Sequence, residues 1–147
     1  METVAVPTHS NTDLDIEAEV TRAIYDLDNV RSTRSELVIS ATRGQVLLTG
    51  YVPTPMIAAE IERAARSVPG VAGVTNQLVD DADLSRRVAE ALATDPRTRG
   101  IPPGYEVASA IGYVTVVGDL DEAQSAAVLE VGQGVDGVRA MRVRPLS

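Results

Sequence analysis

The sequence predicts an α/β (α+β) protein of two tandem units, each with a three-stranded mixed sheet and two helices. Two observations predict this fold class. A shift of 68 residues superimposes Asp13 on Asp81 and Gly44 on Gly112, so the chain repeats itself. In both copies the spacing of apolar residues then changes in the same order, helix, strand, strand, helix, strand.

The repeat predicts three segments: a flexible N-terminal tail over residues 1–12, a first unit over 13–80 and a second over 81–147. A unit of about 65 residues buries only about 60% of its unfolded surface and is marginal by itself. We therefore expect the two units to share an interface and to pack pseudo-symmetrically.

In the first unit the pattern predicts a helix over 12–27, a hairpin over 36–52, a helix over 54–68 and a strand over 69–79. Thr12 or Asp13 is the expected cap of the first helix, with acids in its first turn. The hairpin is expected to turn at Gly44. Thr54 is the expected cap of the second helix, with Pro55 at its first position.

The second unit repeats this order, with a helix over 82–93, a hairpin over 105–118, a helix over 121–131 and a strand over 135–143. The hairpin is expected to turn near Gly112. One loop differs between the units, because "TDPRTRGIPPGYE" has three prolines and two glycines where the first unit has none. This loop is expected to be irregular and exposed.

Composition excludes several kinds of site. The chain has no Cys, and its single His is His9, so neither a His/Cys zinc site nor a Cys- or His-dependent catalytic triad can form within one chain. Without Phe or Trp, the cores must be aliphatic. We expect no cofactor and no metal.

Charge argues against one class of partner. The net charge is −8, and the thirteen basic residues are all Arg. Long-range repulsion then disfavours nucleic acid, and it also disfavours anionic lipid unless a local Arg cluster overrides it. We expect no nucleic-acid partner.

The stretch "GQGVDG" has the G-x-G-x-x-G spacing of a dinucleotide-binding loop. A dinucleotide loop follows a strand and precedes a helix, but here a predicted helix comes before and a predicted strand after. We interpret these glycines as structural, closing the helix with a left-handed residue. The glycines expected to be structural are Gly44, Gly50, Gly70, Gly73, Gly112, Gly118, Gly134 and Gly137. A loss of four residues after Val52 would superimpose Gly70 on Gly134.

The segments "GQVLLTGYV…VPGVAGVTNQLV" and "GYVTVVGDL…GQGVDGVRAMRV" resemble the BON domain, with its pattern G-x-V-x-L-x-G-x-V, an Ala-rich helix and G-V-x-x-V. Both copies fit this pattern. The resemblance implies a non-catalytic binding module, since BON domains are described as phospholipid- or membrane-interaction modules, often in tandem. No catalytic motif of the family can be carried over.

Arginines are the candidate ligand-binding residues. On the last strand, alternation places Arg142 and Arg144 on one face and Arg139 on the other, unless a bulge intervenes. They form either a phosphate-binding ridge or a charged edge that prevents aggregation.

Loop residues are the second set of candidates. Arg97, Arg99 and Tyr105 lie in the proline-rich loop, and Arg31 and Arg34 in the corresponding loop of the first unit. These loops either contact lipid headgroups or a protein, or are simply solvated. Two interpretations are open for the acids at the start of the first helix, a cation site or a solvated helix start. The second is favoured, because acids complement the dipole at a helix N-terminus. These acids are Asp13, Asp15, Glu17 and Glu19.

Three function classes follow from the sequence. The first is a binding module for phospholipid or a membrane surface. The second is a soluble adaptor that binds a protein, or itself, through unpaired strand edges and small-residue faces, by strand addition or helix packing. The third, an enzyme, lacks any visible acid–base or nucleophile constellation. Without a signal peptide or apolar span the expected location is cytoplasmic, and periplasmic only if residues were removed from the N-terminus.

Overall fold

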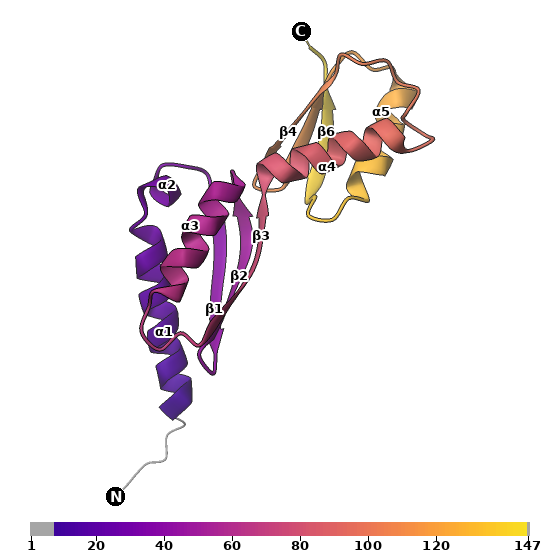
Figure 1. Cartoon of the computed structure of the whole chain (residues 1–147). Coiled ribbons are helices and arrows are strands. Elements are labelled where there is room, and N and C mark those ends of the chain that lie inside the picture. Colours follow the sequence, from indigo (N-terminus) through magenta and orange to yellow (C-terminus); the bar gives the residue numbers. More distant parts are fainter. Residues whose placement is uncertain (1–7, 147) are drawn as a thin grey trace, which may run out of the picture. The chain divides into compact units, whose positions relative to one another are not determined.

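The structure, a computed structural model, describes residues 8–146, with side chains from Thr12 onward. These residues divide into two compact units at the junction of Leu78 and Val79 (Figure 1). Each unit has one three-stranded sheet, ordered β1-β2-β3 in the first unit and β4-β5-β6 in the second. The predicted α/β fold class, with two three-stranded sheets and helices, is confirmed. The pseudo-symmetric packing of the units stays a prediction.

The first unit follows the predicted order of elements. They are α1 (Thr8–Tyr25), α2 (Asp28–Arg31), β1 (Glu36–Thr42), β2 (Gln45–Val52), α3 (Pro55–Arg66) and β3 (Gly73–Asp80). β1 and β2 pair antiparallel, with Ile39 opposite Leu48. Thr54 caps α3 as predicted, because its hydroxyl accepts a hydrogen bond from the N–H of Ile57 at 3.2 Å. The short helix α2 was not predicted, since four residues are too few to show helical periodicity.

The second unit repeats the same order without the short helix. Its elements are α4 (Asp81–Thr94), β4 (Glu106–Ala110), β5 (Tyr113–Val117), α5 (Glu122–Gln133) and β6 (Ala140–Arg144). β4 and β5 are antiparallel and β5 and β6 parallel, so this sheet is mixed as predicted. Asp121 caps α5 with a complete capping box. The proline-rich loop has no helix or strand, which confirms that it is irregular.

Both hairpins turn where the sequence predicts. The two turn residues have positive φ in each case, 54° at Arg43 and 79° at Gly44, then 44° at Ile111 and 84° at Gly112. Two consecutive left-handed residues make a type I′ turn, whose twist matches that of the flanking strands. Glycine at the second position adopts this conformation without a Cβ penalty.

The predicted start of the first helix is wrong. α1 begins at Thr8, within the segment expected to be a flexible tail, so Thr12 and Asp13 lie inside the helix. The carboxylate of Asp13 accepts hydrogen bonds from the backbone N–H of Arg43 at 2.8 Å and of Gly44 at 3.1 Å. The sequence does not distinguish an Asp that binds a distant hairpin from an Asp that caps a helix, because each of them precedes an apolar helical pattern.

The repeat register predicted after Val52 is also wrong. The helix caps Thr54 and Asp121 are 67 residues apart, and so are Gly70 and Gly137, with φ of 93° and 98°. One residue is lost between the copies, not four. Gly70 therefore corresponds to Gly137 instead of Gly134, and the two share a left-handed turn before the last strand.

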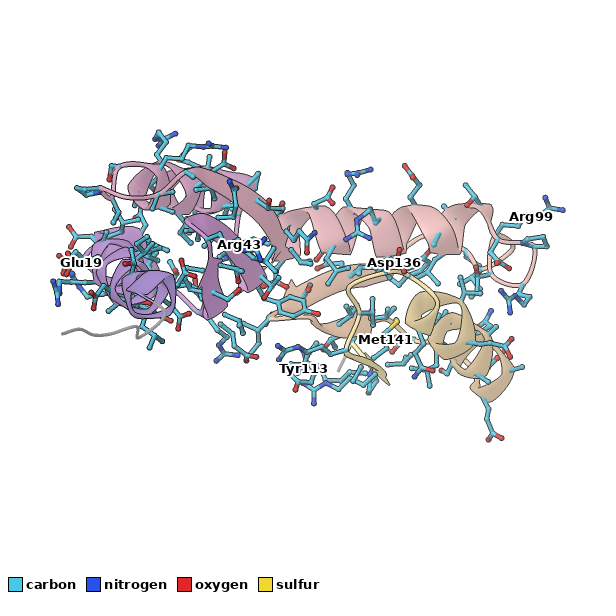
Figure 2. The ribbon with its side chains drawn as sticks, turned by 90° about the horizontal axis from the view of Figure 1, so that it is seen from below. Glu19, Arg43, Arg99, Tyr113, Asp136 and Met141 are labelled. Carbon is cyan, nitrogen blue, oxygen red and sulfur yellow. The ribbon has the colours of Figure 1, made fainter. Side chains whose placement is uncertain are left out.

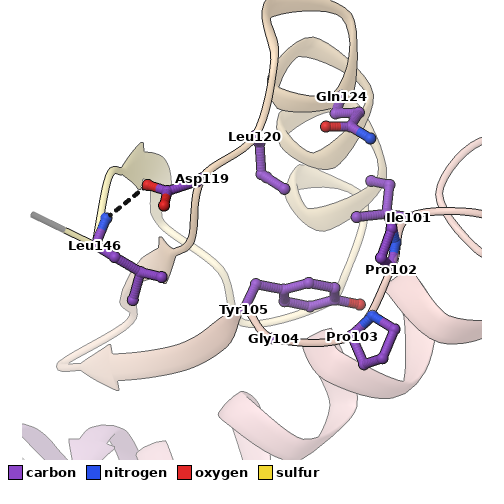
Figure 3. Close-up of a pocket in the computed structure, with 9 residues that line it drawn as sticks. All are labelled: Ile101, Pro102, Pro103, Gly104, Tyr105, Asp119, Leu120, Gln124 and Leu146. Carbon is purple, nitrogen blue, oxygen red and sulfur yellow. Dashed lines mark hydrogen bonds between the residues drawn. The ribbon is translucent and has the colours of Figure 1, made fainter.

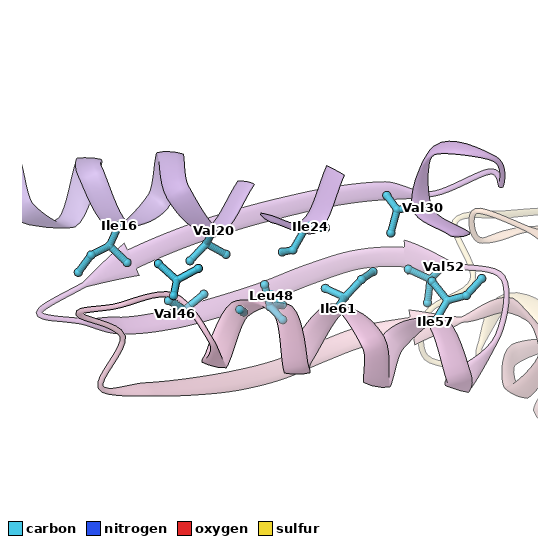
Figure 4. Close-up of a cluster of buried hydrophobic side chains, with 11 residues drawn as sticks. Ile16, Val20, Ile24, Val30, Val46, Leu48, Val52, Ile57 and Ile61 are labelled. Carbon is cyan, nitrogen blue, oxygen red and sulfur yellow. The ribbon is translucent and has the colours of Figure 1, made fainter. Parts of the chain in front are cut away.

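The core of each unit lies between its sheet and its helices. Figure 4 shows the first core, in which Val20, Leu48 and Ile61 are fully buried between α1, β2 and α3. In the second unit the fully buried residues of α4, β5 and α5 are Leu84, Val88, Leu92, Val114, Val116 and Val128. On β2 and β5 buried residues alternate with more exposed ones, so one face of each sheet remains open.

Candidate functional site

The open face of the second sheet gathers the predicted strand arginines. Because Val114 and Val116 are buried toward the helices, Tyr113 points to the open face, where its side chain is about half exposed (51%). The register places Arg142 beside Thr115 and Arg144 beside Val117, both on this face. Strand alternation is confirmed for these two arginines.

Arg139 does not lie on the opposite face, as alternation had predicted. β6 begins only at Ala140, so Arg139 precedes the strand, and its backbone N–H donates to the carbonyl of Gly112 at 2.8 Å. Its guanidinium lies 5.5 Å from the centroid of the Tyr113 ring. This is a cation–π contact, and it turns Arg139 toward the open face.

We call this surface, made of Tyr113, Thr115, Arg139, Arg142 and Arg144, the arginine face. Arg142 Nε donates to Thr115 Oγ1 at 3.3 Å, which orients its guanidinium along the sheet. Tyr113 and Thr115 were not among the predicted site residues, although their alternation with the apolar Val114 and Val116 is visible in the sequence. The arrangement offers several N–H donors beside one aromatic ring. A guanidinium group can donate two parallel hydrogen bonds to two oxygens of one phosphate.

An acid shares this face of the sheet. Glu106 pairs with Val117, which in turn pairs with Arg144, so the acid lies on the far edge strand, two strands from the arginine. At about 4.8 Å per strand, the two backbones are about 10 Å apart. The positive potential of the arginine face is therefore concentrated along β6.

Arg97, in the proline-rich loop, binds carboxylates of its own unit. Its guanidinium donates to Asp95 at 2.9 Å and to Glu130 of α5 at 2.9 Å. The hydrogen bonds from Arg97 lower the pKa of the Asp95 carboxyl to about 2. Thr98 is buried, and its hydroxyl donates to the carbonyl of Leu92 at 2.7 Å. The loop is therefore fastened to α4 and α5, and Arg97 contributes little free positive charge.

The other loop candidates differ in their contacts and in their exposure. Arg31 donates to the carbonyls of Tyr25 at 3.2 Å and Asp26 at 2.9 Å and binds Asp28, which folds the loop around α2. Arg34 and Arg99 are exposed, and Figure 2 shows Arg99 reaching away from the ribbon. Tyr105 is half-buried and lines a hollow of the second unit.

The glycine-rich stretch has the order of elements that the sequence predicts, because it begins in the last turn of α5 and is followed by β6. Its geometry differs in detail, because Gly134 has a right-handed φ of −80° and the left-handed residue is Gly137. Gly132, inside α5, is buried, and a Cβ there would overlap the thioether of Met141. Close approach of helix and strand therefore accounts for the first glycine of the motif.

Of the remaining predicted glycines, Gly50 and Gly118 occupy tight positions, whereas Gly73 lies beside the end of a flexible side chain. Gly50 has φ of 117° and lies against the carbonyl of Glu36. A Cβ at Gly118 would lie 2.7 Å from the Cβ of Tyr105, and one at Gly73 would lie 2.5 Å from Oε1 of Gln45. The contacts of Gly50 and Gly118 support the interpretation that these two glycines serve the fold.

The acids of α1 do not form a cation site in the structure. Within residues 12–146, no group of three His, Cys, Asp or Glu side chains is placed to hold a metal ion. Asp13 is instead bound to the first hairpin, and Asp15 and Glu19 are exposed. No helix in the described part of the chain is long and apolar enough to cross a membrane.

The fold and the arginine face together define an α/β chain of two three-stranded units, with arginines on the open face of the second sheet. Residues 12–79, which span almost all of the first unit, match the family model of the BON domain. The chain is 29% identical over 143 residues to osmotically-inducible protein Y of Escherichia coli (strain K12), covering 86% of this chain and 68% of that protein. The second unit's likeness to the first rests on its sheet order and its hairpin geometry.

A solved structure has a similar fold. The C-terminal domain of CdsD, a structural protein of the type III secretion system of Chlamydia trachomatis, superimposes with a TM-score of 0.64 at 16% identity. The match covers 89% of this chain, and the chain spans 63% of that structure's length. At this identity the likeness shows the fold alone.

Proposed function

We propose that the chain is a non-catalytic binding module whose arginine face binds the phosphate groups of a phospholipid surface. The observation that carries this proposal is the convergence of Arg139, Arg142 and Arg144 on one open sheet face beside an exposed Tyr113. Tyrosine is favoured at membrane interfaces because its ring is apolar and its hydroxyl polar. The match of residues 12–79 to the BON domain supports a binding role.

The expected affinity is weak and sensitive to salt. Each arginine near an anionic leaflet contributes about 1 kcal/mol, so three contribute about 3 kcal/mol, a roughly 150-fold enrichment. The net charge of −8 opposes this attraction at long range. At physiological salt the Debye length is about 8 Å, so screening reduces the repulsion from distant acids as well as the attraction.

Vesicle co-sedimentation tests the proposal. Vesicles of phosphatidylserine and phosphatidylcholine should bind the protein more strongly than phosphatidylcholine alone, and the difference should fall with salt. The variant Arg139→Ala/Arg142→Ala should lose most of the binding. The control Arg22→Ala/Arg63→Ala has the same net charge but changes two exposed arginines of the first unit. Equal binding by wild type and the first variant would refute the arginine face as the site.

A second candidate function is protein binding or self-association in the cytoplasm. The open face of the first sheet favours it, because two apolar side chains are exposed there, Val38 at 61% and Leu47 at 37%. β1 and β2 place one charged residue, Glu36, on the same face. CdsD, the similar structure, is named as a structural protein of a secretion system, which also favours protein contacts.

Sedimentation velocity tests this alternative. A mass that rises with concentration, and that Val38→Thr/Leu47→Thr returns to the monomer value, would support self-association through this face. If the wild type and the variant are both strict monomers, the arginine face is the better supported surface.

A further inference from the structure

Two hollows of the second unit share part of their lining. Asp119 and Leu120 line both of them. The first hollow has a volume of about 290 Å³ and is lined on one side by the end of the proline-rich loop, residues 101–105 (Figure 3). The second has a volume of about 520 Å³ and extends from Asp121 toward Val143 and Pro145. Ligand pockets have volumes of about 300–1,000 Å³, so the first hollow fits one or two side chains.

The walls of the first hollow are mostly apolar. Ile101, Tyr105 and Leu120 are half-buried, so each keeps part of its surface toward the hollow. Figure 3 shows the ring of Tyr105 and the side chain of Leu120 on facing walls, with Ile101 and Pro102 beside them. An aliphatic side chain entering here would remove apolar surface from water.

The floor between the hollows is acidic. Asp119 accepts one hydrogen bond, from the N–H of Leu146 at 3.2 Å, and Asp121 accepts one from the N–H of Gln124 at 2.7 Å. Neither carboxylate forms an ion pair within residues 12–146, and no arginine lines either hollow. Neither carboxylate is therefore neutralised by an arginine among the described residues, and both can accept hydrogen bonds from a cationic group.

This combination is specific to the second unit. The residues of the first unit that correspond to Asp119, Leu120 and Asp121 are Tyr51, Val52 and Thr54, which carry no charge. In the first unit the helix α2 also replaces the proline-rich loop. The acidic, apolar groove is therefore not required by the shared fold.

We propose that the two hollows form one groove that binds a segment of a partner protein in which an Arg or Lys follows an aliphatic residue. The aliphatic side chain enters between Tyr105 and Leu120, and the basic side chain binds the carboxylates of Asp119 and Asp121. Charge complementarity selects this occupant, because an acidic segment would meet two like charges. The groove shares no lining residue with the arginine face and does not depend on the function proposed for it.

Titration of the full chain with short peptides, followed by amide NMR shifts, tests the proposal. The probe is acetyl-Leu-Arg-Leu-Arg-amide, and its neutral counterpart has citrulline in place of both arginines. The arginine peptide should shift the amides of Ile101, Gly104, Tyr105 and residues 119–121. It should bind at least about threefold more tightly than the citrulline peptide, as expected for exposed ion pairs. Equal affinities, or shifts elsewhere only, would overturn the proposal.

Variants provide the second measurement. Asp119→Asn/Asp121→Asn keeps an acceptor for both hydrogen bonds and removes both charges, so it should bind the arginine peptide about as weakly as wild type binds the citrulline peptide. Glu122→Gln/Asp136→Asn makes the same charge change on exposed residues outside the groove and should bind normally. A similar loss of peptide affinity in both variants would mean that net charge alone causes the effect, and it would refute the groove. Vesicle binding by the Asp119→Asn/Asp121→Asn variant should persist, which separates this proposal from the arginine face.

Discussion

The carboxylate of Asp81 accepts a hydrogen bond from the backbone N–H of Gly112 at 3.1 Å, and so fastens the start of α4 to the tip of the second hairpin. The same carboxylate accepts from the N–H of Ile111 at 2.8 Å and from the hydroxyl of Ser109 at 2.6 Å. Asp13 makes the two equivalent backbone contacts in the first unit. Each unit thus uses one aspartate to fix its type I′ turn.

Replacing Asp81 should destabilise the second unit. Asp81 is buried, and Asp81→Ala removes its hydrogen bonds and leaves backbone donors unsatisfied, at a cost of about 3 kcal/mol. Asp13 is more exposed, so Asp13→Ala should cost about 1 kcal/mol. Hydrogen exchange of the hairpin amides measures both effects. Asp15→Ala, on the exposed side of α1, is the control and should change little.

Replacing the turn glycine should also be costly. Gly112 has φ of 84°, and an alanine there costs about 1–2 kcal/mol in the left-handed region. Gly100 has open space around its Cα, so Gly100→Ala should be neutral. Urea denaturation compares the two variants. A Gly112→Ala protein as stable as wild type would contradict the turn assignment.

The glycines of the G-x-G-x-x-G stretch should respond to packing. Gly132→Ala forces Met141 away from α5 and should destabilise by about 1–3 kcal/mol. Gly134 has a right-handed φ, and its nearest neighbour, the carbonyl oxygen of Val131, would lie 3.4 Å from an added Cβ. Gly134→Ala should therefore be neutral or slightly stabilising. Thermal unfolding distinguishes these outcomes, and a large loss in Gly134→Ala with none in Gly132→Ala would contradict the packing explanation.

The ion pair of Asp95 should survive to low pH. With its pKa lowered to about 2 from 3.8, Asp95 stabilises the fold fully above about pH 4, and this contribution is lost as pH falls through 2. An NMR titration of the Asp95 carboxyl carbon measures the midpoint. In Arg97→Ala the midpoint should rise toward 3.8. An unchanged midpoint in that variant would show that Arg97 is not the cause.

Local patterns predicted most of the elements, because each depends on residues close in the chain. Thr54 and Pro55 identified the start of α3, and the Arg43-Gly44 break identified the first turn, since capping and left-handed turns have strong residue preferences. The start of α1 failed because the role of Asp13 depends on Gly44, thirty-one residues away. The register of the last strand failed because small residues recur too often to select one alignment.

The arginine candidates also show which positions local patterns predict and which depend on tertiary contacts. Composition and alternation placed Arg142 and Arg144 on one face, but the position of Arg139 depends on where β6 begins and on the ring of Tyr113. The sequence made Arg97 a candidate ligand-binding residue, whereas the fold brings Glu130 of α5 to it.

The sequence by itself determined the fold class, the order of elements, the two turns and the aliphatic character of the cores. These follow from residue periodicity and from the backbone preferences of glycine and proline, which act over a few residues. Only the tertiary structure decided which charges meet. Contacts such as those of Asp81 with Gly112 and Arg97 with Glu130 join segments about thirty residues apart, and their geometry is set by how helices and strands pack.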